Sequence, residues 1–131
     1  PQELVIGQVG DDYVYLDQVE FIFDPSVDYR TFGQIIITSA GDILELWTAP
    51  GRGYDGTWEP EVEAAAYVGD DFWSVECRIP YGQKGFPQPH SGDIWNFNAI
   101  RLFRGRDYSQ WIVSFRDGSS HADKLGFLLF K

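Results

Sequence analysis

Hydrophobic and polar residues alternate with a period of two along most of the chain. Val19, Phe21 and Phe23 share one side of such a segment, and Glu20 shares the other side with Ile22 and Asp24. A period of two is that of a β-strand, in which successive side chains point to opposite faces of the sheet. The same alternation recurs at residues 95–102 and 110–115. We therefore expect strands, and almost no helix, along most of the chain.

Short glycine-containing turns predict two β-hairpins. Residues 34–39 and 42–47 flank Ala40-Gly41, and residues 62–68 and 72–79 flank a turn at 69–71. Such turns between alternating runs are the local signal of a hairpin. Further strands are predicted at Leu4 to Val9 and at Leu125 to Phe130. Loops are predicted at Pro25, at residues 50–53 and at residues 80–89, with a single helical turn at 81–84.

About eight or nine short strands with regularly spaced turns are typical of an antiparallel β-sandwich. We predict an all-β fold of this kind, jelly-roll-like or immunoglobulin-like. A chain of 131 residues suits one domain, so residues 1–131 are expected to form a single domain, or the C-terminal part of a longer one.

Composition narrows the possible partners. The chain has 20 acidic and 10 basic residues, a net charge of −10, and 17% of its residues are aromatic. An acidic chain repels phosphate backbones and anionic lipid surfaces, so neither nucleic acid nor a membrane is an expected partner. No apolar run reaches the ~18 residues of a membrane span. The excess of acid serves solubility, or some carboxylates hold calcium.

No residue cluster predicts catalysis. His90 and His121 both lie in polar loops without a metal-binding spacing, and no Gly-x-Ser-x-Gly motif is present. Cys77 is the one cysteine and lies on an alternating apolar face, which favours a buried, inert thiol. Carboxylates are numerous, but nothing singles out a glycosidase pair. We therefore expect a protein that is not an enzyme.

Several segments, taken in order, resemble the family 9 carbohydrate-binding modules. The chain carries Asp17-x-Val19-Glu20, then Trp73-x-Val75-Glu76 leading to Ile79-Pro80. Gly92-Asp93-x-Trp95 with Asn98, Ser109-x-Trp111 and a final strand at 125–130 follow in the family's order. The similarity covers roughly residues 13 to 131. It implies a β-sandwich of a secreted protein, extracellular or periplasmic, that binds carbohydrate without cleaving it.

The resemblance implies a binding site of aromatic and polar side chains. Glu20 matches the family's sugar-binding Glu, and Tyr13 and Tyr15 flank the position of one of its two sandwiching tryptophans. That position is Val14 here, and the second is Ser119. Arg101 and Arg116 are candidates for further polar contacts. An aromatic face offers apolar contact to a sugar ring, and directional polar groups fix its orientation. The alternative for Glu20 is a solvated side chain, or one paired with an arginine.

Calcium is the one cofactor that we expect, with Asp24 and Asp28 as its ligands. The two residues lie four apart in a loop that ends a strand, and the family likeness points the same way. The alternative is a turn in which each carboxylate accepts hydrogen bonds from nearby backbone N–H groups.

The N-terminus predicts contact with another protein chain. Family relatives carry strands before the Asp-x-Val-Glu segment that this chain does not contain, so a partner chain or an upstream segment is expected along the edge near residues 3–9. Three function classes follow. These are a carbohydrate-binding module, a structural or assembly domain without sugar binding, and a haem-binding relative. The chain has no Met, which removes the usual Met ligation of haem.

Overall fold

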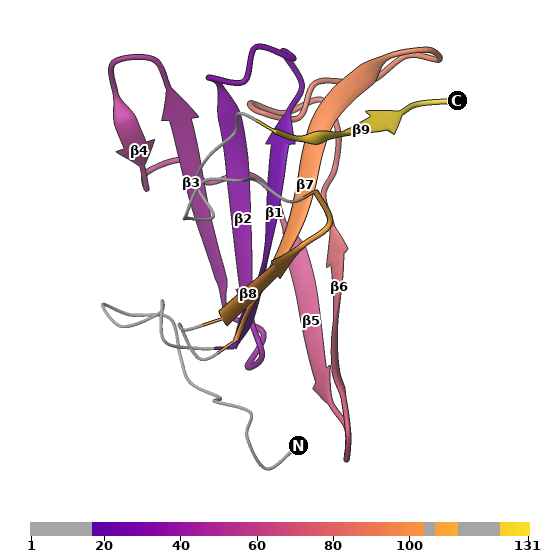
Figure 1. Ribbon diagram of the computed structural model, residues 1–131. Helices are drawn as coiled ribbons and strands as arrows, with labels where there is room; N and C mark the ends of the chain where they lie inside the picture. The colour runs from indigo at the N-terminus through magenta and orange to yellow at the C-terminus, as the bar shows by residue number, and fades with distance from the viewer. Residues whose placement is uncertain (1–16, 104–106, 113–123) are drawn as a thin grey trace.

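A computed structural model describes residues 17–103, 107–112 and 124–131. Within these ranges the chain forms nine strands and no helix (Figure 1). The strands are β1 (Gln18–Asp24), β2 (Phe32–Thr38), β3 (Ile43–Ala49), β4 (Gly53–Asp55), β5 (Glu63–Val68), β6 (Trp73–Arg78), β7 (Ile94–Phe103), β8 (Asp107–Gln110) and β9 (Gly126–Leu129). All pairings are antiparallel. The predicted all-β fold with eight or nine strands is confirmed.

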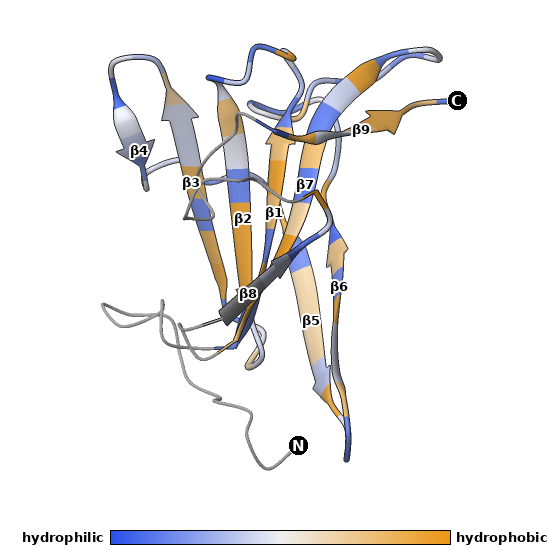
Figure 2. Cartoon of the chain, viewed as in Figure 1, coloured by the Kyte–Doolittle hydropathy of each residue, from blue (hydrophilic) through white to orange (hydrophobic). Residues whose placement is uncertain are grey.

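The strands belong to two sheets. Seven of them form one sheet in the order β4-β3-β2-β1-β7-β8, with β9 also paired to β7, and β5 pairs with β6 alone. The most apolar stretches lie in β1, β2 and the neighbouring part of β7, in the middle of the large sheet (Figure 2). β1 and β2 lie between two strands each, so their backbone groups are paired on both edges.

Both predicted hairpins are present. β2 and β3 are joined at Ala40-Gly41, where Gly41 has a φ of 92° and its N–H donates to the Thr38 carbonyl at 2.9 Å. A positive φ is strained for residues with a Cβ, which explains the glycine. In the second hairpin the Gly69 N–H donates to the Phe72 carbonyl at 2.8 Å.

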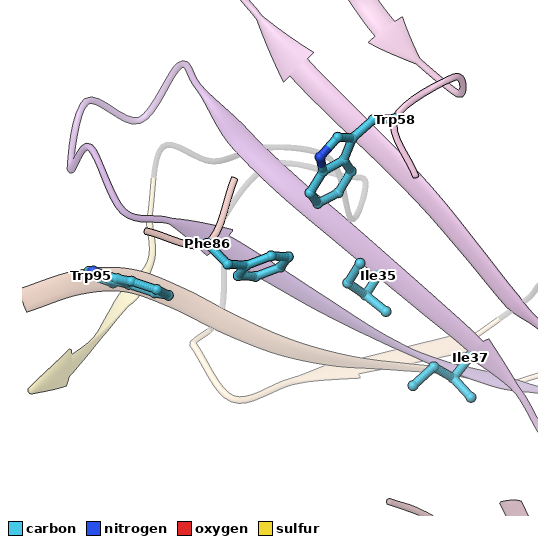
Figure 3. Close-up of a cluster of buried hydrophobic side chains, with 5 residues drawn as sticks. All are labelled: Ile35, Ile37, Trp58, Phe86 and Trp95. Carbon is cyan, nitrogen blue, oxygen red and sulfur yellow. The ribbon is translucent and has the colours of Figure 1, made fainter. Parts of the chain in front are cut away.

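The second hairpin covers one face of the large sheet. Inward side chains of β5 and β6, among them Ala64, Val75 and Cys77, pack against a buried cluster. That cluster contains Ile35 and Ile37 of β2 and Trp95 of β7, together with Trp58 and Phe86 from the loops (Figure 3). Phe21 and Phe23 of β1 pack against the same cluster. The opposite face of these strands is buried as well, since β2 is buried at all seven positions and Glu20 and Ile22 of β1 are buried.

Trp58 is the tightest fit in this core. Its side chain is 4% exposed and its Nε1–H donates to the Lys84 carbonyl at 3.1 Å. The indole lies against two glycines, where an added Cβ would come within 2.5 Å of the ring at Gly33 and 2.6 Å at Gly85. The ring therefore occupies the space into which the side chain of a residue other than glycine would project at Gly33 or Gly85.

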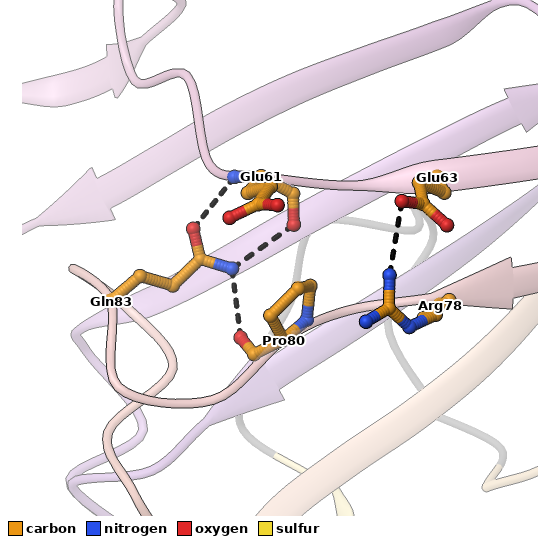
Figure 4. A network of polar contacts seen from close by, with 5 residues as sticks. All are labelled: Glu61, Glu63, Arg78, Pro80 and Gln83. Carbon is orange, nitrogen blue, oxygen red and sulfur yellow. Dashed lines mark hydrogen bonds and ion pairs between the residues drawn. The ribbon is translucent and has the colours of Figure 1, made fainter.

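Gln83 joins the two chain segments at the base of the second hairpin. Its Oε1 accepts from the Glu61 N–H at 2.6 Å, and its Nε2–H₂ donates to the carbonyls of Glu61 and Pro80 at 3.0 and 2.8 Å (Figure 4). On the outer face of the same hairpin, Arg78 and Glu63 form an exposed ion pair at 3.0 Å. The side-chain amide of Gln83 thus links the two ends of the hairpin, at the place where the sequence predicted a helical turn.

Two local predictions differ from the structure, one is confirmed, and one lies outside the described residues. Residues 81–84 form bends and an isolated bridge to Phe86 in place of a helical turn. Of the strand predicted at 110–115, Gln110 is the last residue of β8, residues 111–112 form a bend, and residues 113–115 lie outside the described residues. The loop predicted at residues 50–53 is present as a turn over residues 50–52, and β4 begins at Gly53. The strand predicted at Leu4 to Val9 lies outside the described residues.

Candidate functional site

Glu20, the predicted sugar-binding carboxylate, lies in the interior. Its side chain is 3% exposed and accepts hydrogen bonds from Gln34 Nε2 at 2.7 Å and from Gln18 Nε2 at 3.1 Å. Burial raises the pKa of the Glu20 carboxyl, and the two amide hydrogen bonds offset part of that rise. The expectation of a solvated Glu20 was wrong, and no ion pair with an arginine forms within the described part of the chain.

Glu20 belongs to a layer of polar side chains across neighbouring strands of the large sheet. Asn98 of β7 donates to Gln110 Oε1 and to the Ile112 carbonyl, both at 3.1 Å, and accepts from the Ile112 N–H at 3.0 Å. Among the described residues, Gln18 Oε1 and Gln110 Nε2 are buried without a hydrogen-bond partner. Buried polar atoms are normally paired, so these two are exceptions within the polar layer.

Glu20 and Arg101, predicted to share a site, lie on opposite faces of the large sheet. Glu20 pairs with Ile100 of β7, whereas Arg101 pairs with Val19. Side chains of directly paired residues share a face, and successive residues alternate. One sugar ring therefore cannot contact both. The other predicted contacts, Tyr13, Tyr15 and Arg116, lie outside the described residues.

The predicted calcium ligands act as turn acceptors. Asp24 is fully buried and accepts from Ser26 Oγ at 2.8 Å, from the Tyr29 N–H at 2.8 Å and from Asn96 Nδ2 at 2.8 Å. Asp28 is exposed and accepts from the N–H groups of residues 30 and 31 at 2.7 and 2.6 Å. The slight burial of Asp28 raises the pKa of its carboxyl, but these hydrogen bonds outweigh it and leave that pKa below its usual range.

All of these donors belong to the protein, which supports the turn alternative for the loop. No group of three or more His, Cys, Asp or Glu side chains suited to a metal occurs in the described ranges. Calcium stays a prediction, and titration with a chelator while the melting temperature is followed would test it.

Arg101 lines an open cleft between the two sheets. The cleft has a volume of about 370 Å³ and is lined by Val19 of β1, Arg101 of β7 and residues 71–75 of the second hairpin. Val19 and Arg101 are directly paired and form one wall, and Trp73 and Val75 form the apolar part of the other. The Arg101 guanidinium lies 5.1 Å from the centre of the Phe103 ring, a cation–π distance that holds it against the sheet.

Polar groups and the aromatic Phe72 complete the lining of the cleft, and Tyr67 lies beside Phe72. Asp71 and Ser74 line it on the hairpin side. Phe72 is 52% exposed, and its ring centre is 5.7 Å from that of Tyr67, which is 62% exposed. An apolar body with a few polar groups and exposed aromatic faces is the usual composition of a small-ligand site. Of the residues here, the sequence pointed to Arg101 alone.

The aromatic pair is held by the turn beneath it. A Cβ on Gly69 would come within 2.8 Å of the Phe72 ring, so this ring lies directly over the turn backbone. The signal in the sequence was a tight turn at 69–71 flanked closely by two aromatic residues, Tyr67 and Phe72. It indicates a hairpin tip that exposes aromatic side chains, but it does not show what lies beside the tip.

The remaining nucleophilic and acid–base candidates lie apart from the cleft. His90 is exposed, with Nδ1 3.5 Å from Asp93 Oδ2. Cys77 is partly buried under the hairpin, and burial raises the pKa of its thiol. A thiol with a raised pKa is a poor nucleophile, as expected of an inert residue. His121 lies outside the described residues.

Within the described residues no membrane-spanning helix points to a function, and no match to a known protein does so. No described segment forms a helix of the length and hydrophobicity that crossing a membrane requires. Comparisons with protein-family models, with curated proteins and with solved structures found no match to this chain.

Proposed function

We propose that this chain is a non-catalytic carbohydrate-binding module of a secreted protein, extracellular or periplasmic. In this proposal its two sheets form a β-sandwich, jelly-roll-like or immunoglobulin-like, and the sugar binds in the cleft at Arg101. The observation that carries it is the composition of that cleft, in which exposed aromatic faces adjoin a guanidinium, a carboxylate and a hydroxyl. Sugar rings present both C–H faces and hydroxyl groups, which these two kinds of group bind.

The choice between Arg101 and Glu20 follows from access. Both Glu20 carboxylate oxygens already accept hydrogen bonds from protein amides, and the side chain is buried. Arg101 is exposed at the mouth of a cleft, and no carboxylate within the described ranges is paired with it. Glu20 is therefore assigned to the interior, and the sugar contact to Arg101 with Phe72.

A glycan array followed by calorimetry tests the proposal. The unaltered chain should bind at least one glycan of the array, and both Arg101→Gln and Phe72→Ala should weaken that binding about tenfold or more. Arg52→Gln is the matched control, because Arg52 is an exposed arginine on the turn between β3 and β4. The absence of any bound glycan, or an unchanged affinity in Arg101→Gln, would overturn the proposal.

A second candidate, an assembly domain, is favoured by a different surface. Ile94, Phe127 and Leu129 are all exposed, and their strands β7 and β9 pair so that Ile94 lies opposite Leu129. Neighbouring exposed apolar side chains of this size are common at protein–protein contacts. If the chain assembles through this surface, sedimentation should show a mass above that of one chain. The double variant Phe127→Ser with Leu129→Ser should then show the mass of a single chain. A single-chain mass at every concentration would exclude this candidate.

A further inference from the structure

The cleft at Arg101 continues directly onto an exposed aromatic platform. Phe72 belongs to both, because its ring lines the cleft and also lies 5.7 Å from the Tyr67 ring at an interplanar angle of 42°. Tyr67 is not among the residues that line the cleft. The hairpin tip therefore offers two neighbouring places for an apolar ring face, one inside the cleft and one outside it.

The backbone beneath the platform is held by hydrogen bonds of the hairpin. The Gly69 N–H donates to the Phe72 carbonyl at 2.8 Å and closes the turn, and the Phe72 ring lies over the Gly69 backbone with no room for a Cβ. The backbone of Tyr67 on β5 is paired with that of Ser74 on β6. A backbone that is already ordered loses little entropy on binding, which favours affinity for a ring that stacks at this hairpin tip.

The charges of the cleft restrict the kind of sugar. Its lining carries one cation, Arg101, and one anion, Asp71, so the cleft itself has no excess charge. The chain as a whole carries a net charge of −10. A strongly acidic protein repels polyanions at a distance, and a balanced cleft does not compensate for that repulsion. These charges favour a neutral ligand over a uronate or a sulfated sugar.

We propose that the cleft and the Phe72–Tyr67 platform are two adjacent ring positions for a neutral oligosaccharide. One ring enters the cleft between Arg101 and the hairpin, and the next ring of the same chain stacks on Tyr67 outside it. This inference rests on the proposed function and adds the charge and the minimum length of the ligand.

The test uses oligomers of one to four rings of β-1,4-linked glucose, xylose and mannose, with β-1,4-linked uronates of the same lengths. Calorimetry with the full chain should show binding to a neutral series and an affinity that rises about tenfold from one ring to two. Tyr67→Ala should abolish that rise and leave the affinity for one ring unchanged, whereas Arg101→Gln should weaken both. Tyr67→Phe keeps the ring and should keep the rise.

Two controls separate stacking from damage to the fold. Tyr54→Ala removes a tyrosine of similar exposure, 53%, on β4 and should not change any affinity. The melting temperature of Tyr67→Ala should match that of the unaltered chain, because the side chain is exposed. Equal affinity for one and four rings, an unchanged rise in Tyr67→Ala, or binding of the uronates alone would each overturn the inference while leaving sugar binding intact. If nothing binds in these series or on the array, the proposed function itself fails.

Discussion

Gly33 gives the sharpest test of the packing around Trp58. Gly33 lies in β2 between Phe23 of β1 and Trp47 of β3, and the Trp58 ring rests on it from above. In Gly33→Ala the new Cβ would lie 2.5 Å from Trp58 Cη2 and 3.0 Å from Cζ3. The closest contact is far inside van der Waals range, so either the ring or the strand must move.

The ring has little freedom to move away. Its Nε1–H is bonded to the Lys84 carbonyl, and its ring centre is 5.1 Å from that of Trp47 and 5.7 Å from that of Phe86. Overpacking of a filled core costs about 1–3 kcal/mol. For a domain of this size that corresponds to a melting temperature lower by roughly 4–12 °C. Gly33 has no positive φ, so the expected loss comes from the clash alone.

Urea denaturation of Gly33→Ala and Gly56→Ala provides the comparison. A Cβ on Gly56 would meet Leu46 Cδ2 at 3.8 Å, an ordinary contact, so this substitution should be neutral or slightly stabilising. In a Trp58→Phe background the cost of Gly33→Ala should fall by about 1 kcal/mol or more, because the smaller ring leaves space. If Gly33→Ala is as stable as Gly56→Ala, the close approach of Trp58 to Gly33 is not present in solution and the reasoning is refuted.

Three further predictions concern charged groups. Asp24→Ala should lower the free energy of unfolding by about 3–5 kcal/mol in urea denaturation, because it leaves buried hydrogen-bond donors unpaired. The control Asp70→Ala, on the exposed turn, should change it by less than about 0.5 kcal/mol, and equal losses in the two variants would contradict the buried role of Asp24. Folded Glu20 holds its proton more tightly than unfolded Glu20, so stability should fall as pH rises from the usual carboxyl pKa to the raised one, and Glu20→Gln should lack this fall; parallel pH profiles would contradict it. A double-mutant cycle on Glu63 and Arg78, whose side chains are 64% and 68% exposed, should give a coupling below about 1 kcal/mol that decreases with salt; a larger, salt-independent value would not fit a solvated pair.

The hairpins were predictable because their signals are local. Gly41 and Gly69 each sit in a turn between two alternating runs, and nothing distant is needed to interpret them. β4 was not predictable in the same way. It has only three residues, it follows directly on a turn, and Gly51 and Gly53 both have positive φ angles, so the sequence there indicates a loop. β8 ends at Gln110, and beyond it the Asn98 side chain binds the backbone N–H and C=O of Ile112. Alternation does not reveal such a contact.

The site was less predictable than the fold because it depends on register. Glu20 was expected to bind sugar, with a solvated side chain or a pair with an arginine as the alternative. It is buried, and Gln34 on the adjacent strand β2 donates a hydrogen bond to it there. Arg101 was identified as a binding candidate, but its cleft exists only because the second hairpin folds back across the sheet at Val19. Neither the contact of Gln34 with Glu20 nor that of the second hairpin with the sheet at Val19 can be predicted from a single segment of the sequence.

The pairing of β1 with both β2 and β7 also sets the order in which the strands of the large sheet can form. β1 pairs with β2 across a short loop, but its other neighbour is β7, with Gln18 opposite Leu102. During synthesis the β1–β4 meander can form early, while the second edge of β1 waits for more than half of the chain. Pairing over such a separation slows folding, and an open apolar strand edge invites association in the meantime. Ribosome-bound chains that stop before β7 are therefore expected to need a chaperone, whereas chains that include it should bury that edge unaided.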